Sequence, residues 1–228
     1  QPLARAIKAV ERRAVMQGYA PSHDMTKVAP APFVVKGTST LYGPDGAQKL
    51  QWVKTKLDMA LAEQAIRDAV PGAIIVGDST QPVYAGNLFY DPDRAGGWFN
   101  AATGYGALGY GLGAAIGAAV AASGVPVICL VGDGGLQFDP AEMRVAFDEG
   151  LPVTYVVWNN ASYREIAEAM RDAQTEIIGC SPSPLKLDHL AAACDLGFQS
   201  VAETPEALAA ALRQPHDGPR LIEVRVLS

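Results

Sequence analysis

The sequence predicts an α/β fold, a doubly wound parallel sheet with helices on both faces. Strand-like runs alternate with helical segments along residues 56–228, as they do in parallel sheets. The strand-like runs are largely apolar along their whole length, which is typical of strands covered on both sides. With 49% apolar and 18% charged residues in a chain of 228, a sizeable core can also form.

Residues 1–55 differ in character from the rest of the chain. Residues 1–15 can form a helix, but prolines and glycines then give mostly linker and turn signals. We therefore expect the tail of a preceding domain and a linker in residues 1–55, and one large domain in residues 56–228. Because the first residue is Gln1 and not Met, we also expect the chain to be a piece of a longer protein.

Start and stop signals predict the helices of the large domain. Pro71 and Gly72 end the first of them, an amphipathic segment. The third is expected to begin with Asp139 as N-cap and Pro140 in its first turn, and to stop at Gly150. In chain order, the predicted helices are residues 57–70, 103–124, 139–150, 162–173, 187–197 and 204–214.

Four short, largely apolar runs are the predicted strands. They are residues 73–78, 125–132, 153–160 and 220–227. Asp78 ends the first strand, Asp133 follows the second, and Asn159 and Asn160 end the third. In parallel sheets ligands bind beyond the carboxyl ends of the strands, so these side chains are expected to line one rim and to converge on one site.

Charge and cysteine content exclude some classes of partner. The net charge of −6 disfavours nucleic acid and anionic membranes, which require clustered Lys and Arg. Three well-separated cysteines and no signal peptide indicate a reducing cytoplasm. No charged residue occurs in 95–132, but the apolar part of this stretch is mostly Gly and Ala, so a buried helix is favoured over a membrane span.

The loop after the second strand has the composition of a metal and phosphate site. Asp133 is followed by Gly134 and Gly135, which allow a close approach of the backbone and direct N–H groups at an anion. Mg²⁺ takes one or two carboxylates together with phosphate oxygens. Asn160 could add its amide oxygen and Ser162 its backbone carbonyl. Taken singly, each motif is equally compatible with an ordinary turn or a helix cap.

The spacing of the two motifs resembles a known family. "GDG", 24 residues and "NN" is similar to the diphosphate-binding motif of thiamine-diphosphate-dependent enzymes. The resemblance implies that Asp133, Asn160 and the carbonyl of Ser162 hold Mg²⁺, while Gly134 and Gly135 contact the diphosphate. Tyr163, the next residue in the loop, is a further candidate contact with the cofactor.

Two further stretches extend the resemblance over roughly residues 56–228. "GYGALGYGLGAAIGA" is similar to a segment of the acetolactate-synthase-like group, and this implies that the Gly106 carbonyl receives the pyrimidine amino group and that Leu108 supports the bent cofactor. Leu108 replaces the usual Met, and Gly113 replaces the usual Pro. "GDSTQP" lies where the family has a loop that contacts the diphosphate, which makes Ser79 and Gln81 candidates.

The family resemblance implies a reaction on a small 2-oxo acid, with decarboxylation favoured and acetolactate-type carboligation as the alternative. In this family the glutamate that activates the cofactor lies in a separate pyrimidine-binding domain, usually of a second subunit. We therefore expect no catalytic residue in this chain, a homodimer or homotetramer for the whole protein, and no activity from the chain alone.

One acidic helix face bears on the substrate. Glu165, Glu168 and Asp172 recur at helical spacing, either as a solvated face or as a partner for a cationic substrate tail such as a guanidinium. Ile166 stands where simple pyruvate decarboxylases carry a catalytic Glu. The pattern is similar to decarboxylases of 5-guanidino-2-oxopentanoate (2-ketoarginine), which makes Glu165 a candidate substrate contact.

A dinucleotide site is a competing interpretation. Gly104, Gly106 and Gly109 form a G-x-G-x-x-G pattern, the fingerprint of NAD-binding domains. The fingerprint should directly follow a strand, and "GGWFNAAT" is a poor one. An NAD-dependent oxidoreductase and a non-catalytic binding module of the same fold therefore remain as alternatives.

Overall fold

A computed structural model of the protein describes residues 34–35, 39–40 and 61–226. Strands β1 (Val34–Val35) and β2 (Ser39–Thr40) form a short antiparallel pair. The predicted helix over residues 1–15 and the predicted domain boundary at residue 55 lie outside the described residues. Of the predicted helix 57–70, the described part is helical over residues 61–69.

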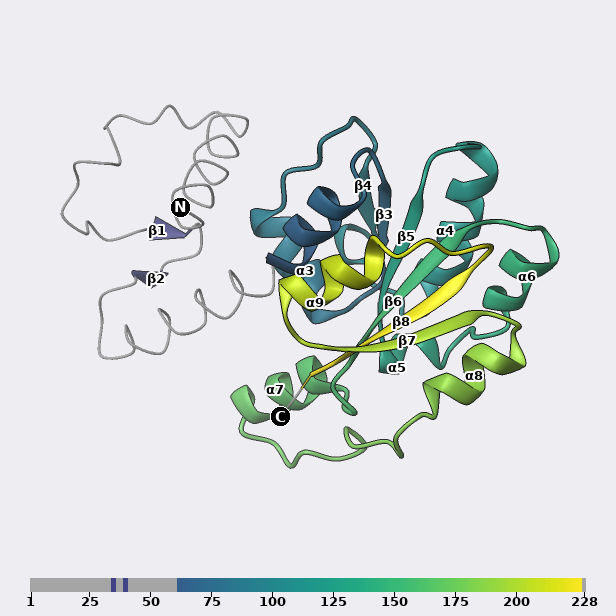
Figure 1. Ribbon diagram of the computed structural model, residues 1–228. Helices are drawn as coiled ribbons and strands as arrows, with labels where there is room; N and C mark the ends of the chain where they lie inside the picture. Colours follow the sequence, from purple (N-terminus) through teal and green to yellow (C-terminus); the bar gives the residue numbers. More distant parts are fainter. Residues whose placement is uncertain (1–33, 36–38, 41–60, 227–228) are drawn as a thin grey trace.

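The large domain is built on a six-stranded parallel sheet (Figure 1). Its strand order is β4-β3-β5-β6-β8-β7, and all five neighbouring pairs run parallel. The strands are β3 (Ile74–Gly77), β4 (Trp98–Asn100), β5 (Val127–Gly132), β6 (Val153–Asn159), β7 (Gly197–Ala202) and β8 (Arg220–Arg225). The predicted parallel α/β sheet is confirmed.

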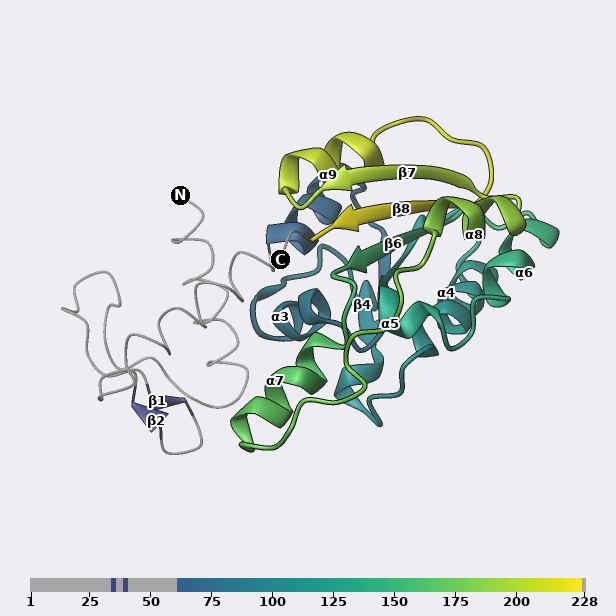
Figure 2. The same cartoon turned by 90° about the horizontal axis from the view of Figure 1, so that it is seen from below.

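Helices cover both faces of this sheet (Figure 2). Buried side chains of α4, α6 and α8 form one core cluster with the sheet, and those of residues 61–69, α3 and α9 form a second cluster on the other face. The helices are α3 (Gln81–Phe89), the 3₁₀ turn η1 (Ala101–Thr103), α4 (Tyr110–Ala121), α5 (Asp133–Leu136), α6 (Glu142–Asp148), α7 (Arg164–Asp172), α8 (Leu187–Ala193) and α9 (Pro205–Leu212). The fold is therefore doubly wound, as predicted.

The central strands β3, β5 and β6 are largely apolar because both of their faces are buried. In β6, Val153, Tyr155 and Val157 belong to the first cluster, whereas Val156 and Trp158 belong to the second. Successive side chains of a strand point to opposite faces, so a strand covered on both sides needs an apolar residue at every position.

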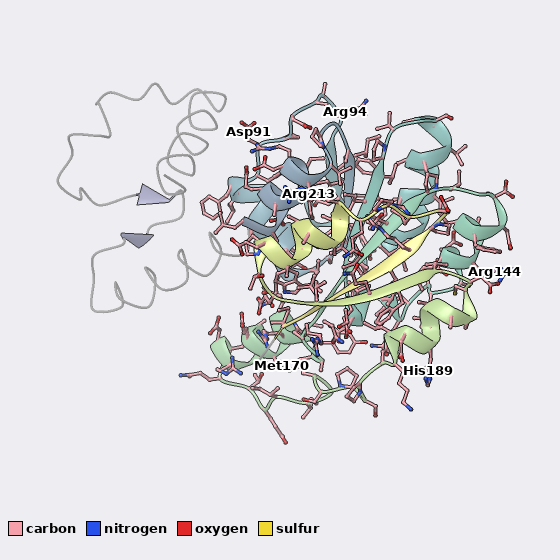
Figure 3. All side chains as sticks on the ribbon, in the orientation of Figure 1. Asp91, Arg94, Arg144, Met170, His189 and Arg213 are labelled. Carbon is pink, nitrogen blue, oxygen red and sulfur yellow. The ribbon has the colours of Figure 1, made fainter. Side chains whose placement is uncertain are left out.

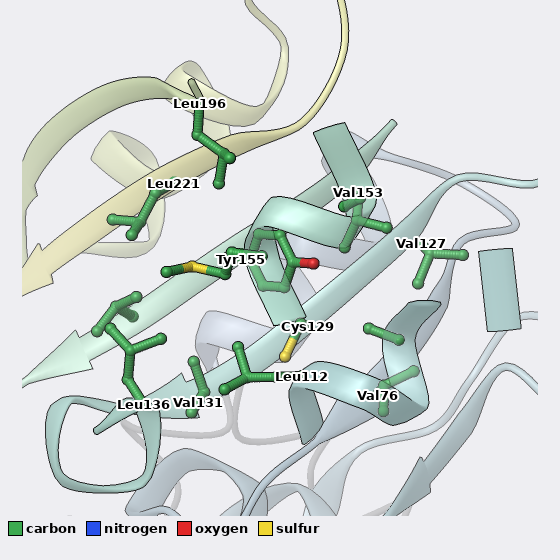
Figure 4. Close-up of a cluster of buried hydrophobic side chains, with 14 of the residues drawn as sticks. Val76, Leu112, Val127, Cys129, Val131, Leu136, Val153, Tyr155, Leu196 and Leu221 are labelled. Carbon is green, nitrogen blue, oxygen red and sulfur yellow. The ribbon is translucent and has the colours of Figure 1, made fainter. Parts of the chain in front are cut away.

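Tyr155 lies at the centre of the first cluster. Figure 4 shows its ring close to Cys129, with Leu112 and Leu221 nearby. The phenol is fully buried, and its oxygen has no hydrogen-bond partner among the described residues. Burial raises the pKa of this phenol, so Tyr155 stays neutral and acts as a large packing side chain.

Five elements of the described residues were missed from the sequence: α3, β4, η1, α5 and β7. The stretch after Asp78 is not only a loop, because α3 begins at Gln81, with Thr80 as N-cap and Pro82 in the first turn. A polar residue followed by a proline is a helix-start signal that could have revealed it. Strands β4 and β7 were also missed; β4, judged a poor strand, pairs in register with Ile75 to Gly77.

The predicted cap of the third helix was wrong. Helix α6 begins at Glu142, and its N-cap is Ala141, which makes no side-chain capping bond. The preceding turn is held instead by backbone bonds, in which the N–H groups of Glu142 and Met143 donate to the carbonyls of Asp139 and Pro140. Pro140 therefore lies in a turn that precedes the helix.

The order of the strands places a topological switch point between β3 and β5. The chain leaves β3 to form β4 on one side and then returns to form β5 on the other side. Such a switch point is where ligands bind in doubly wound sheets.

Helix α4, which lies within the uncharged residues 95–132, has 12 residues. Within the described residues, no helix has the length and apolar character needed to cross a membrane.

Candidate cofactor and metal site

The carboxyl ends of the neighbouring strands β5 and β6 bring Asp133 and Asn160 together. Asp133, the first residue of α5, is 5% exposed, and its Oδ1 accepts a hydrogen bond from the backbone N–H of Asn160 at 3.3 Å. Burial raises the pKa of Asp133, while the N–H groups around the carboxylate and the charge of Arg164 oppose this rise. The structure therefore brings Asp133 and Asn160 together; that they bind a metal stays a prediction.

The turn after β6 is fixed by its own side chains. Asn159 Oδ1 accepts from the N–H of Ala161 at 3.1 Å, and Asn160 Oδ1 accepts from the N–H of Ser162 at 3.0 Å. Between them, Ala161 has a φ of 52°, which is rare for a residue with a Cβ. Strain of this kind is often found at functional sites.

The same turn is anchored by a backbone carbonyl that was not predicted as part of the site. The carbonyl of Cys180 accepts from Ser162 Oγ at 3.0 Å and from the N–H of Tyr163 at 2.9 Å. The segment that follows α7 thus holds both residues. Any residue can supply a carbonyl, so no residue type marks such a role in a sequence.

The two glycines after Asp133 are each required by a close neighbour. A Cβ added at Gly134 would lie 2.6 Å from Cε1 of Tyr163, so the Tyr163 ring rests against this loop. A Cβ added at Gly135 would lie 2.7 Å from Asp78 Oδ1. Both glycines therefore permit tight packing, and their N–H groups remain candidates for the diphosphate.

The predicted place of Asp78 on the open rim was wrong. Its side chain is fully buried, with Oδ1 accepting from the N–H of Ser79 at 2.7 Å and Oδ2 from that of Gly111 at 2.9 Å. Asp78 therefore caps the first turn of α4 and lies behind Gly135. Burial raises its pKa, and the bonds from Gly111 and Ser79 oppose the rise.

Ser79 and Gln81 follow β3, at the same carboxyl edge of the sheet. The hydroxyl of Ser79 is buried and interacts with the phenol of Tyr84, but it forms no hydrogen bond of standard geometry to a described residue. Gln81 is 5% exposed, and its amide is already engaged: Nε2 donates to Glu165 Oε1 at 2.8 Å, and Oε1 accepts from Asn160 Nδ2 at 3.3 Å. The predicted contacts of Gln81 with the diphosphate and of Glu165 with the substrate stay predictions.

Gly106 and Leu108 lie in the loop that connects η1 to α4. Gly106 has a φ of 75° and is exposed, and Leu108 is half-buried. A Cβ added at Gly106 would meet Ser79 Oγ at 4.0 Å, and one at Gly109 would lie 2.8 Å from Phe138 Cβ. This loop is therefore near both Ser79 and the residues that follow α5.

Other polar residues lie away from these strand ends. Figure 3 shows Arg144 and His189 on α6 and α8. The side chain of His189 is 72% exposed and His216 bonds a nearby carbonyl, as expected of surface residues; His23 lies outside the described residues. Cys129, Cys180 and Cys194 are all free and buried.

A parallel sheet with a carboxylate, an amide and glycine N–H groups at its switch point defines a domain for a phosphate-bearing cofactor and its metal ion. The chain belongs to the thiamine pyrophosphate enzymes. Its residues 78–224 match the family described as "Thiamine pyrophosphate enzyme, C-terminal TPP binding domain". Thiamine pyrophosphate is thiamine diphosphate, so the predicted family is confirmed.

Relatives and solved structures agree with this family. The chain is 36% identical over 125 residues, 52% of its length, to a protein of Pseudomonas aeruginosa named "Probable 2-ketoarginine decarboxylase". It is 32% identical over 174 residues, 71% of its length, to the acetolactate synthase large subunit of Parasynechococcus marenigrum. The matches span only 22% and 27% of those two proteins.

Two solved structures have the same fold. The thiamine diphosphate-dependent 4-hydroxybenzoylformate decarboxylase of Rhodococcus jostii RHA1 aligns with a TM-score of 0.62 at 27% identity, over 92% of this chain and 38% of that one. The benzoylformate decarboxylase of Polynucleobacter necessarius aligns with a TM-score of 0.62 at 23% identity, over 73% of this chain and 32% of that one.

The residues at this edge of the sheet fit thiamine diphosphate and Mg²⁺, the usual partner metal of this family. One carboxylate with neutral oxygens suits a metal ion whose charge is mostly balanced by a diphosphate. The buried Ser79 hydroxyl, which forms no hydrogen bond of standard geometry to a described residue, suits an incoming phosphate oxygen. The chemistry of the donors therefore agrees with the family assignment.

Proposed function

We propose that the chain is the diphosphate-side domain of a Mg²⁺- and thiamine-diphosphate-dependent enzyme that decarboxylates a 2-oxo acid. The observation that carries the proposal is the contact of Asp133 with Asn160 in a chain of this family. These two residues end neighbouring strands and present hard oxygen ligands at a switch point.

Each residue of the site has one task in this proposal. Asp133, the Asn160 side-chain oxygen and the Ser162 carbonyl would hold Mg²⁺. Gly134, Gly135, Ser79 and Tyr163 would contact the diphosphate side. When bound, thiamine diphosphate supplies the electron sink for cleaving a bond next to a carbonyl, while the protein supplies placement and electrostatics.

The loop before α4 would meet the other end of the cofactor. Gly106 would accept the pyrimidine amino group with its carbonyl, and Leu108 would support the bent form. A Cβ added at Gly106 would meet Ser79 Oγ at 4.0 Å, which supports this assignment. The activating glutamate would come from the pyrimidine-binding domain of a second subunit in a homodimer or homotetramer, so the chain alone is predicted to be inactive. We assign the enzyme to the cytoplasm.

For the substrate, we propose 5-guanidino-2-oxopentanoate. The 36% identity to a probable 2-ketoarginine decarboxylase supports it, and so do Glu165, Glu168 and Asp172 on α7, which suit a guanidinium. The second candidate is acetolactate-type carboligation, which the 32% identity to an acetolactate synthase over 71% of the chain favours. NAD is no longer a candidate, because the chain belongs to the thiamine pyrophosphate enzymes.

Turnover by the full-length protein tests the proposal. The protein would be given Mg²⁺, thiamine diphosphate and either 5-guanidino-2-oxopentanoate, pyruvate or benzoylformate, and the released CO₂ and any acetolactate would be measured. We expect CO₂ from the guanidino acid, no acetolactate, and loss of turnover with EDTA. Acetolactate from pyruvate would establish the carboligase instead, and no turnover of any 2-oxo acid would refute both.

A further inference from the structure

The Gln81 side chain bridges two segments that are far apart in the sequence. It lies at the start of α3 and bonds Asn160, 79 residues further on, and Glu165, 84 residues further on. In the sheet β5 lies between β3 and β6, so the bridge crosses the end of the strand that leads into Asp133. Nothing in the proposed site explains why these three side chains form a chain of hydrogen bonds.

The two ends of this hydrogen-bond chain fix its direction. At one end the backbone N–H of Ser162 can only donate, and at the other end the carboxylate oxygen of Glu165 accepts. Asn160 must therefore turn its oxygen toward Ser162 and its NH₂ toward Gln81. Gln81 must in turn offer its oxygen to Asn160 and its NH₂ to Glu165.

Reversing the Asn160 amide would break this chain at two points. The NH₂ would then face the N–H of Ser162, and the oxygen would face the oxygen of Gln81. Because Gln81 is 5% exposed, water has little access to replace the lost bonds. This hydrogen-bond chain therefore favours one of the two orientations of the Asn160 amide.

We propose that Gln81 is a positioning residue, held in place by Glu165, that keeps the side-chain oxygen of Asn160 on the side of Ser162. This inference rests on the proposed function, in which that oxygen and the Ser162 carbonyl are metal ligands. It also adds a task to the predicted one of two residues: Gln81 orients a metal ligand besides its predicted contact with the diphosphate, and Glu165 orients Gln81 through Oε1. Residues that orient a metal ligand typically contribute 10–100-fold to metal affinity.

Single substitutions at the two positions separate this role from a packing role. Gln81→Met keeps the size of the buried side chain but removes both hydrogen bonds, and we expect about a tenfold weaker binding of the metal ion. Glu165→Leu should weaken binding about fivefold, since Gln81 keeps its bond to Asn160 but loses its anchor. Glu165→Gln should bind within about twofold of the native protein, because its oxygen can still accept from Gln81.

A charge exchange gives the sharper test. Gln81→Glu places two carboxylates where an amide and a carboxylate were 2.8 Å apart, and it should weaken binding as much as Gln81→Met. Adding Glu165→Gln to this variant restores the chain, since Gln at 165 can donate to Glu at 81, which can accept from Asn160. The double variant should regain affinity to within about threefold, which a simple packing role does not predict.

The readout is binding of Mn²⁺, used as a paramagnetic replacement for Mg²⁺, to the full-length protein with thiamine diphosphate, followed by electron paramagnetic resonance. Matched controls are Glu142→Leu, which removes a carboxylate from the first turn of α6, and Gln199→Met in β7; both should bind Mn²⁺ like the native protein. Thermal melting establishes that each variant is folded, and Glu165→Leu tests the inference if Gln81→Met does not fold.

The outcomes separate this inference from the function on which it rests. Native-like Mn²⁺ affinity of Gln81→Met, or no recovery in the double variant, would overturn the positioning role while the cofactor assignment stands. A native protein that binds no Mn²⁺ in the presence of thiamine diphosphate would refute the proposed function itself.

Discussion

Two neighbouring strands of the sheet end in the same three residues, and the two ends have different tasks. The sequence Val-Gly-Asp occurs at residues 76–78 and again at residues 131–133. In each case Val and Gly end a strand, β3 or β5, and Asp follows it; the two strands pair in parallel. Asp78 is fully buried and caps α4 through Gly111, whereas Asp133 faces the turn of Asn160. Identical local sequence thus gives a structural carboxylate in one case and a candidate ligand in the other.

The difference lies in what stands opposite each carboxylate. Asp78 meets the N–H groups of Ser79 and Gly111, which consume both of its oxygens. Asp133 accepts a bond from the N–H of Asn160, whose loop holds the proposed ligands Asn160 Oδ1 and the Ser162 carbonyl, and glycines follow Asp133. A Val-Gly-Asp strand end therefore becomes a site only where a second loop with further ligands reaches it.

The largest expected effect is on stability and concerns Asp78. Asp78→Ala leaves two buried N–H groups without acceptors, each of which costs 1–3 kcal/mol, so the free energy of unfolding should fall by about 4 kcal/mol. Urea denaturation of the full-length protein measures this loss. A loss below about 1 kcal/mol would contradict the capping role.

The second effect concerns Asp133, where we expect a change in ligand binding and little change in stability. Asp133→Ala removes the one carboxylate of the proposed metal site and should weaken binding of thiamine diphosphate with Mg²⁺ about 100-fold, or about 2.7 kcal/mol. Isothermal titration calorimetry on the full-length protein measures it. The free energy of unfolding without cofactor should stay within about 1 kcal/mol of native, and native-like affinity would rule out Asp133 as the ligand.

A smaller effect follows from the close packing of Gly135 against Asp78. Gly135→Ala adds a Cβ 2.7 Å from Asp78 Oδ1 and should lower the free energy of unfolding by about 2 kcal/mol. The matched control is Gly113→Ala in α4, where the nearest atom would be 3.7 Å away and the better helix former should add about 0.5 kcal/mol. Urea denaturation of both variants measures these two effects of opposite sign, and equal changes in the unfolding free energy at the two glycines would contradict the predicted clash at Gly135.

The smallest effect is on pH dependence. Because burial raises the pKa of Asp78 above its ordinary value of 3.8, the native state keeps this proton to a higher pH than the unfolded chain. The stability gained in this way is complete below pH 3.8 and is lost as the pH rises through the raised pKa. Asp78→Asn carries no such proton, so the difference in unfolding free energy between native protein and variant should narrow from pH 4 to pH 7. A difference that widens over this range would contradict the raised pKa.

The sequence predicts most of the fold because burial on both faces leaves a local signal. A run such as residues 153–159 must be apolar at nearly every position, and this is visible without any knowledge of its partners. The spacing between Asp133 and Asn160 is equally local, since the helices α5 and α6 and the strand β6 fill it. These features were therefore within reach of the sequence.

What the sequence could not predict depends on contacts between distant residues. Gly111, 33 residues after Asp78, decides that this carboxylate is a cap. Gln81 and Glu165 meet across 84 residues, and Cys180 acts through a backbone carbonyl that any residue type could supply. Nothing in the residue types or their spacing distinguishes these pairs from others, so only the folded chain reveals them.

Thermal melting of the full-length protein tests the central claim most directly, because a ligand that binds only the native state raises the melting temperature. Native protein, Asp133→Ala and Asp78→Asn would each be melted alone, with Mg²⁺, with thiamine diphosphate, with both, and with NAD as a control. We predict a rise for the native protein that requires both Mg²⁺ and thiamine diphosphate, a rise of similar size for Asp78→Asn from a lower starting temperature, and none for Asp133→Ala. An undiminished rise in Asp133→Ala, or a rise with NAD instead, would contradict the account.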